Sequence, residues 1–483
     1  MTGGRLRALR RLLGRLTARG GIGRGVDRPN ILLLMTDQQR WDALGCTGGW
    51  VDTPNVDRLA AEGVLFANAY TNSPACVPAR VSLAIGRYPH NHGVWRNKQY
   101  TLPEARPTWM RAVRDAGYST SVFGKTHLHA HSGDLRDREP LVRAYGLDHV
   151  DEITGPRASA RTASNLTDLW REAGILDEFM RDLEDRLEHR PWESRPSPVP
   201  LELYPDVYVG QQAARYLRAQ TGSKPWFCWV SFGGPHEPWD APEPYASRYD
   251  PAAMPPPIVR GEAGHDRPKG LLDKRLARDP LPFDAADVAR LRANYAGNVT
   301  LIDDQIGEIL RVVEERGELD RTVVAFVSDH GEMNGDFQLL YKHNFLGPAV
   351  RVPFILRLPR QAGAEAGAGV VSDTMVELMD LGATLVELAG GTQIKRSLAR
   401  SVVPVLDDPS RSHRDSALSE MRREIMLATS DWKVALNREG EVYLLFDLCA
   451  DPTERHNLAA RPEYRETEQR LRRMLQDRVD AAR

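Results

Sequence analysis

The sequence predicts an α/β fold, with a mostly parallel sheet flanked by helices and a smaller C-terminal α+β subdomain. Three observations lead to this prediction. From residue 30 onward, apolar runs alternate with helical stretches, and reactive side chains follow the apolar runs. Near the C-terminus the alternation ends, and the pattern is typical of a β-hairpin. Strands that alternate with helices are typical of a parallel sheet with helices on both faces.

Four apolar runs are predicted to be strands. A strand of a parallel sheet is buried on both faces, so it is apolar at consecutive positions and not at alternate ones. The runs cover residues 30–37, 118–124, 226–232 and 322–329. Helices are predicted from Thr53 through VDRLAAEG, before Gly117, over 207–219 and over 285–316.

Two stretches interrupt the alternation of strands and helices. Residues 132–204 are polar and irregular, and residues 237–283 are rich in proline. We interpret both as insertions over the working edge of the sheet, because loops at such an edge usually carry the groups that select a substrate.

The C-terminal part has a different pattern. DWKVALN and EVYLLFDL flank a turn at residues 438–440 and predict a β-hairpin, and a charged helix is predicted over 462–482. The expected domains are therefore a basic arm over residues 1–27, a catalytic domain over 28–395, and a C-terminal subdomain with an antiparallel sheet and a terminal helix over 396–483.

Charge and hydropathy exclude several classes of protein. The 483 residues include 64 Lys and Arg against 66 Asp and Glu, without the basic excess of a general nucleic-acid binder. No segment is apolar for long enough to span a membrane. Arginines interrupt the apolar residues of the basic arm, which does not match a secretory signal, so a cytoplasmic location is expected.

The four cysteines lie far apart and form no CxxC pair, so the sequence predicts neither a disulfide scaffold nor a zinc cluster. Cys46, Cys228 and Cys449 are expected to be small buried hydrophobic residues. Cys76 is different, because it is predicted to open a helix in SPACVPARVSLAIG. A helix N-terminus stabilises an anion, and Arg80 lies one turn further on. This segment alone fits a nucleophile or a buried structural cysteine equally well.

Each predicted strand ends in a reactive group. The carboxyl ends of parallel strands lie along one edge of a sheet, where ligands bind, so groups far apart in the sequence are expected to meet there. A single Asp after a strand is often a turn former, and it is the coincidence of four strand ends that favours a site. The groups are Asp37, then Lys125 and His127, then His236, then Asp329 and His330.

These segments resemble the sulfatase family. CVPAR matches the Cys-x-Pro-x-Arg motif in which a maturation enzyme converts the Cys to formylglycine, and GYSTSVFGKTHLH resembles the second family signature. The ordered set is far more specific than any single motif, and it implies an alkaline-phosphatase-like fold. The further segments, in the family's order between Pro29 and Leu458, are PNILLLMTDQQRWDALG, TPNVDRLAAEGVLFANAYT, GGPHEP, VSDHGE and FDLCADPTERHNL.

The resemblance implies a metal site. Asp37, Gln38, Asp329 and His330 would surround one divalent metal, and formylglycine 76 would supply a further oxygen. Ca²⁺ is the expected ion, with Mn²⁺, Mg²⁺ and Zn²⁺ as alternatives. Oxygen ligands favour Ca²⁺ or Mg²⁺, and an imidazole ligand shifts the preference towards Mn²⁺ or Zn²⁺.

The resemblance also implies catalytic roles. Arg80 and Lys125 would hold the formylglycine hydrate, and His127 would take a proton when the sulfated intermediate collapses. His236 and Lys342 would bind substrate oxygens, and one of them would protonate the leaving group. Imidazole suits proton transfer near neutral pH.

Two pairs of residues resemble one branch of the family. Many members carry two adjacent acids after the first strand and Asp-Asn after the last, whereas this chain has Asp37-Gln38 and Asp329-His330. These pairs resemble the branch of choline sulfatases and phosphonate monoester hydrolases. Asn97 matches an Asn that some branches place beside the nucleophile, and it is expected to bind substrate.

The expected function is hydrolysis of a small-molecule sulfate ester by the hydrate of formylglycine 76, through a covalent sulfated intermediate. The implied partner is a formylglycine-generating maturation enzyme. Two alternatives remain open: a phosphonate or phosphate mono- or diester hydrolase with the same nucleophile, and a non-catalytic relative that binds a metal or anion. All residues of the two signature motifs are present, which argues against the second alternative, because a binding protein has no need of a maturation motif.

Overall fold

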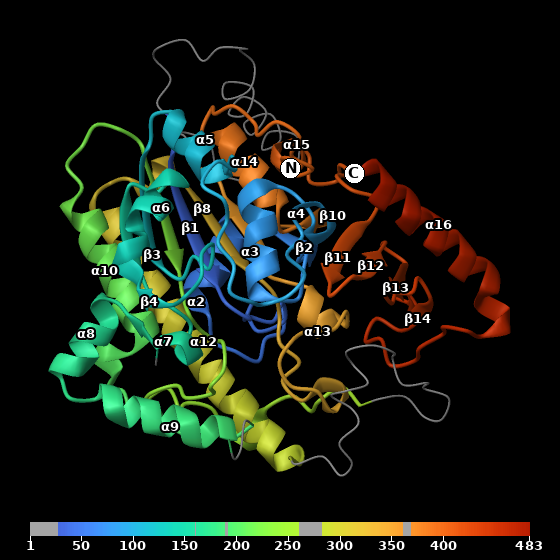
Figure 1. Ribbon diagram of the computed structural model, residues 1–483, viewed down its shortest axis with the longest axis horizontal. Coiled ribbons are helices and arrows are strands. Elements are labelled where there is room, and N and C mark those ends of the chain that lie inside the picture. Colours follow the sequence, from blue (N-terminus) through green and yellow to red (C-terminus); the bar gives the residue numbers. More distant parts are fainter. Residues whose placement is uncertain (1–27, 160, 189–191, 260–282, 361–368) are drawn as a thin grey trace.

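The structure is a computed structural model that describes residues 28–159, 161–188, 192–259, 283–360 and 369–483. The predicted basic arm, 1–27, and most of the second half of the proline-rich stretch, 260–282, lie outside the described residues. A large sheet covered by helices occupies the centre, and a smaller sheet with a long terminal helix lies at one side (Figure 1).

The central sheet has eight strands in the order β10-β2-β9-β8-β1-β7-β3-β5. Every pair of neighbours is parallel except the two pairs that include β9, which runs antiparallel to β2 and β8. The strands are β1 (Asn30–Thr36), β2 (Val64–Tyr70), β3 (Ser119–Gly124), β5 (His149–Glu152), β7 (Trp226–Ser231), β8 (Thr322–Ser328), β9 (Phe354–Arg357) and β10 (Val370–Glu377).

The register places the chemically reactive strand ends side by side. Thr36 at the end of β1 is opposite Ser328 at the end of β8, and Met35 is opposite Ser231 at the end of β7. Ser231 is in turn opposite Gly124 at the end of β3. The residues that follow these four strands therefore leave the sheet at the same edge, as the sequence predicts.

Two hydrophobic cores cover the two faces of the sheet. Alternate residues of β1 point to opposite sides, with Ile31 and Leu33 in one core and Leu32 and Leu34 in the other. The first core contains residues of α3 (Cys76–Ile85), α5 (Trp109–Asp115), α6 (Glu139–Ala144), α14 (Asp380–Leu388) and α15 (Val403–Asp407). The second contains residues of α2 (Pro54–Glu62), α8 (Asn165–Glu172), α9 (Leu176–Glu188), α10 (Pro205–Ala219) and α12 (Ala285–Glu315).

The C-terminal sheet is antiparallel and four-stranded. Its strands are β11 (Ala417–Met421), β12 (Glu424–Ala428), β13 (Trp432–Leu436) and β14 (Val442–Asp447), joined in sequence order. Leu471, Leu475 and Val479 of α16 (Arg465–Ala481) pack against this sheet. The predicted hairpin and terminal helix are therefore confirmed, and so is the predicted α/β class with its smaller C-terminal subdomain.

Some expectations are wrong. The sequence patterns identify β1, β3, β7 and β8 but miss the other strands of the central sheet. Residues 132–204 are not simply irregular insertions, because they contain β5, which joins the sheet, and α8 and α9, which pack on it. Cys46 and Cys449 are exposed, and only Cys228 is buried as expected for a small hydrophobic residue.

The shortest α-helices within the described ranges have four residues each. They are α4 (Pro89–His92), α7 (Pro156–Ser159) and α13 (Gly347–Val350). They lie in the connections between the longer elements (Figure 1). Among the described residues, every helix is too short or too polar to cross a membrane.

Candidate active site

Four predicted site residues form one buried cluster at the carboxyl edge of the sheet. Asp37, Cys76, Asp329 and His330 each offer one ligand atom, and these atoms lie within 4.8 Å of one another. Asp37 follows β1, Asp329 and His330 follow the adjacent strand β8, and Cys76 is the first residue of α3. The parallel register explains why residues nearly 300 positions apart in the sequence meet here.

The contacts of His330 orient its ring. Its Nδ1 lies 3.0 Å from the carbonyl oxygen of Gly331, and its Nε2 lies 3.1 Å from Cys76 Sγ. The carbonyl accepts a hydrogen bond, so the proton is assigned to Nδ1 and Nε2 keeps its lone pair toward the cluster. Burial lowers the pKa of His330 and favours the neutral imidazole, the form that binds a metal.

Arg80 joins the two carboxylates of the cluster. Its Nε donates to Asp329 Oδ2 at 2.8 Å, and its Nη2 lies 3.3 Å from Asp37 Oδ2. Its Nη1 donates to the Lys125 carbonyl at 2.5 Å and to Ser231 Oγ at 2.9 Å. The guanidinium therefore connects α3 to residues that follow β1 and β8, and to the ends of β3 and β7.

Lys125 supplies the second cation. Its Nζ lies 2.5 Å from Asp37 Oδ2, inside the buried cluster. Burial opposes ionisation of Asp37, but Lys125, His236 and Arg80 outweigh it and hold the pKa of Asp37 well below its ordinary value. The two acids and the two cations balance formally, so a bound divalent metal would leave the site positive and suited to an anionic ester.

The donor set fits a divalent metal. Two carboxylates and one imidazole already converge in a buried space, and each has a neighbour that orients it. Oxygen ligands suit Ca²⁺ and Mg²⁺, while the imidazole also allows Mn²⁺ or Zn²⁺.

Gln38 contributes to the cluster through its backbone. Its N–H donates to Asp329 Oδ1 at 3.1 Å. Its side chain lies in a neighbouring group, where Nε2 donates to Glu237 Oε2 at 2.8 Å and to Glu332, and Oε1 accepts from Lys342. The predicted ligand role of the Gln38 side chain therefore stays a prediction.

His236 and Lys342 form a pair beside the cluster. Lys342 Nζ lies 2.8 Å from His236 Nε2, and His236 Nδ1 lies 2.7 Å from the carbonyl oxygen of Glu237. Burial opposes the charge of Lys342, but the Cys76 thiol and Glu237 raise the pKa of its ammonium group. Burial likewise opposes ionisation of Glu237, whose pKa is held below its ordinary value by His236 and Lys342.

Asn97 and His127 complete the predicted set. Asn97 Nδ2 lies 3.7 Å from Cys76 Sγ, and its Oδ1 accepts from the backbone N–H of Val77 at 3.0 Å. His127 lies in the loop after β3 with a backbone φ of 56°. Burial lowers the pKa of its imidazole well below the ordinary value, helped by His131 and Lys125.

Three residues of the site were not predicted from the sequence. Ser231 accepts from Arg80, and the carboxylates of Glu237 and Glu332 bind the Gln38 amide. Glu237 and Glu332 lie inside the motifs GGPHEP and VSDHGE, so those motifs contained the signal. Ser231 ends an apolar run, where the sequence gives no sign of a polar contact.

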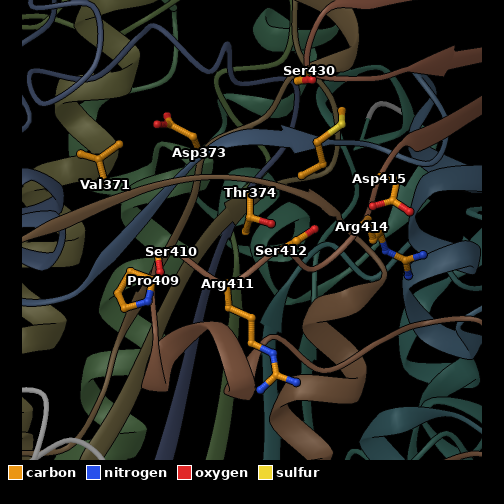
Figure 2. A pocket seen from close by; sticks show the side chains of 11 residues that line it. Val371, Asp373, Thr374, Pro409, Ser410, Arg411, Ser412, Arg414, Asp415 and Ser430 are labelled. Atoms are coloured by element: carbon orange, nitrogen blue, oxygen red, sulfur yellow. The ribbon is translucent and has the colours of Figure 1, made fainter.

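A separate cavity of about 730 Å³ lies beside β10 (Figure 2). Residues of β10, the segment 409–415 and Ser430 line it, and none of the predicted site residues is among them. The cavity is therefore distinct from the cluster at the carboxyl edge.

Together, the mostly parallel sheet and the buried acid, imidazole and thiol groups at its edge define a protein of the alkaline-phosphatase-like fold with a candidate site for a metal ion. The family model described as sulfatase matches residues 29–391, and a model described as the C-terminal part of N-sulphoglucosamine sulphohydrolase matches residues 335–481. The chain belongs to the sulfatase family, which confirms the prediction made from the ordered motifs.

Relatives match nearly the whole chain. An arylsulfatase of Clostridium perfringens is 29% identical over 466 residues, which cover 93% of this chain and 94% of the relative. A choline-sulfatase of Rhizobium meliloti is 27% identical over 463 residues, 90% of this chain and 83% of the relative. The crystal structure of a phosphonate monoester hydrolase of Agrobacterium radiobacter has a TM-score of 0.76 and 25% identity, and the match covers 94% of this chain and 96% of that one.

The cluster predicts stoichiometric metal binding. We expect about one divalent ion per chain in the purified protein, and Asp37→Asn or Asp329→Asn to reduce this to below about a tenth, because each change removes an anionic ligand. Elemental analysis after gel filtration measures the content. Asp303→Asn is the matched control, because Asp303 is also buried but accepts from the backbone N–H groups of Asn55 and Val56 at the start of α2. Full metal content in both cluster variants would contradict the assignment.

Proposed function

We propose that this protein hydrolyses a sulfate ester, with residue 76 as the nucleophile after its oxidation to formylglycine. One observation carries the proposal: Cys76 opens a buried helix within the acid and imidazole cluster, and Arg80 and Lys125 lie around the same carboxylates. The motif CVPAR and the names of the arylsulfatase and choline-sulfatase relatives support it.

The proposed reaction has two stages. One hydroxyl of the formylglycine hydrate attacks sulfur, the ester S–O bond breaks, and the alcohol leaves with a proton. The sulfate is then carried on residue 76. Loss of the proton from the second hydroxyl reforms the aldehyde and expels sulfate by cleavage of the C–O bond, and water restores the hydrate.

A divalent metal held by Asp37, Asp329, His330 and Gln38, with Ca²⁺ as the expected ion, would supply Lewis-acid stabilisation of the anionic oxygens. Arg80 and Lys125 are proposed to act in the same direction, since each places a buried positive charge on a carboxylate of the cluster that contains residue 76. Buried charges that are already oriented stabilise developing negative charge more strongly than the same charges in water. The Asn97 amide, 3.7 Å from Sγ, is proposed to donate to a substrate or nucleophile oxygen.

His127 is the proposed base for the second hydroxyl. A base must be unprotonated to act, and the depressed pKa of His127 keeps its imidazole neutral near neutral pH. His236 and Lys342 are proposed to bind the substrate oxygens. The proton in their 2.8 Å hydrogen bond is available to the departing oxygen.

A second candidate keeps the nucleophile and changes the substrate to a phosphonate or phosphate ester. The observation that favours it is the likeness in structure to the phosphonate monoester hydrolase, together with the Asp329-His330 pair. With a divalent metal bound, the positive site would attract either anion, so the choice between sulfur and phosphorus needs a measurement.

Turnover of two aryl esters separates these functions. We expect a higher kcat/KM for 4-nitrophenyl sulfate than for 4-nitrophenyl phenylphosphonate, and a loss of at least about 10³-fold in kcat for Cys76→Ala, because the nucleophile is removed. Cys449→Ala, which makes the same change at an exposed cysteine, is expected to leave kcat unchanged. A higher kcat/KM for the phosphonate would favour the second candidate, and an active Cys76→Ala protein would contradict both.

The pKa of His127 sets an expected pH dependence. Because the folded state depresses this pKa below the ordinary 6.5, the imidazole stays neutral as the pH falls through 6.5, and the base is lost only at lower pH. The acid limb of kcat that depends on His127 is therefore expected below pH 6.5. His127→Asn should remove it, and His456→Asn, at an exposed histidine, should not. A limb at or above 6.5 that disappears in His127→Asn would contradict this account.

A further inference from the structure

A group of buried residues behind His127 has no role in the proposed reaction. The loop that follows β3 carries Lys125 and His127 and then two more histidines, His129 and His131. Glu152, the last residue of β5, lies opposite Gly124 in the parallel register and therefore next to the start of this loop. Glu152 is 6% exposed and His131 is 9% exposed.

The Glu152 carboxylate contacts several hydrogen-bond donors of this loop. It accepts from the backbone N–H of Thr126 at 3.2 Å and from the Thr126 hydroxyl. Its other oxygen lies 2.6 Å from His129 Nε2. Burial opposes protonation of His129, but Glu152 raises the pKa of this imidazole, so the two form a buried ion pair. One carboxylate thus holds the loop on both sides of His127.

The rings of His127 and His131 are stacked. Their centroids are 4.4 Å apart and the ring planes differ by 11°. His131 is itself held between this stack and Glu152, with its Nε2 3.8 Å from Glu152 Oε1 and its ring edge-on to His129 at 5.5 Å. The His131 ring thus lies flat against the His127 ring, with Glu152 and His129 around it.

His127 needs such support. Its φ of 56° is a left-handed conformation that a residue with a side chain seldom adopts, and such backbone persists where the surroundings hold it. Its Nδ1 is buried and makes no hydrogen bond within the part of the chain that the structure describes. Nδ1 therefore does not orient this imidazole, and the stack on His131 is a contact that can.

We propose that Glu152 and His131 are positioning residues: Glu152 folds the loop that carries Lys125 and His127, and the His131 ring holds the His127 ring in its working orientation. This inference rests on the proposed function, since it assigns a task to residues behind the proposed base. The His131 ring is needed for its flat shape and not for its proton.

Two substitutions of His131 separate shape from chemistry. His131→Phe keeps a flat ring and removes the titratable nitrogens, and His131→Ala removes the ring. With 4-nitrophenyl sulfate we expect kcat of His131→Ala to fall about 10- to 100-fold, because a small misplacement of a catalytic group costs a factor of this size. KM should stay within about threefold, and His131→Phe should retain kcat within about threefold of the wild type.

His149→Ala is the matched control. His149 stands on the same strand as Glu152 and stacks on Tyr216 at 4.5 Å, so the variant also removes one imidazole from a stacked pair, but outside the site. His149 is exposed whereas His131 is buried, so His149→Ala is expected to lower the melting temperature by no more than His131→Ala. Only His131→Ala should lower kcat. Glu152→Gln, which loses the ion pair, should lower kcat as well.

Unchanged kcat in His131→Ala would overturn the inference. So would a His131→Phe enzyme as slow as His131→Ala, because the imidazole itself would then be required. A wild-type protein, matured at Cys76, that turns over neither the sulfate nor the phosphonate ester would overturn the proposed function, and the role of His131 with it.

Discussion

The structure of the site depends on one constraint, the approach of two buried carboxylates. Parallel pairing of β1 and β8 places Asp37 and Asp329 side by side where water does not screen them. Like charges in such a place are stable only with cations between them. Arg80 bridges both acids and Lys125 holds the first, so these two cations balance the two carboxylates. The charge of a bound divalent metal would then be left to attract the proposed anionic ester.

The need to bring Arg80 to both carboxylates also constrains helix α3. Arg80 can reach both acids only if α3 is fixed, and every residue of this helix is buried. The loop that carries Lys342 contains several residues with positive φ, among them Phe337 and Tyr341. Arg40 and Arg292 each bind Asp336 within this loop, at 2.7 and 2.6 Å, so a second set of buried ion pairs holds the strained backbone in place.

The sequence was sufficient where local patterns and motifs carried the information. Apolar runs located β1, β3, β7 and β8, and the polar residues after them meet at one edge. The sequence did not predict β5 and β10, the two edge strands of the central sheet. Because an edge strand is only partly buried, its residues do not form a continuous apolar run. The approach of Glu152 to the loop after β3 could not be predicted either, because it depends on strand pairing and not on a local pattern.

The proposed mechanism requires residue 76 to be a formylglycine nucleophile in an active sulfatase. Mass spectrometry of the peptide that contains residue 76, from protein produced in its native host, tests this most directly. We expect a peptide lighter than the cysteine form by one sulfur and two hydrogens and heavier by one oxygen, in the same preparation that hydrolyses an aryl sulfate. An active preparation in which residue 76 is entirely unmodified cysteine would contradict it.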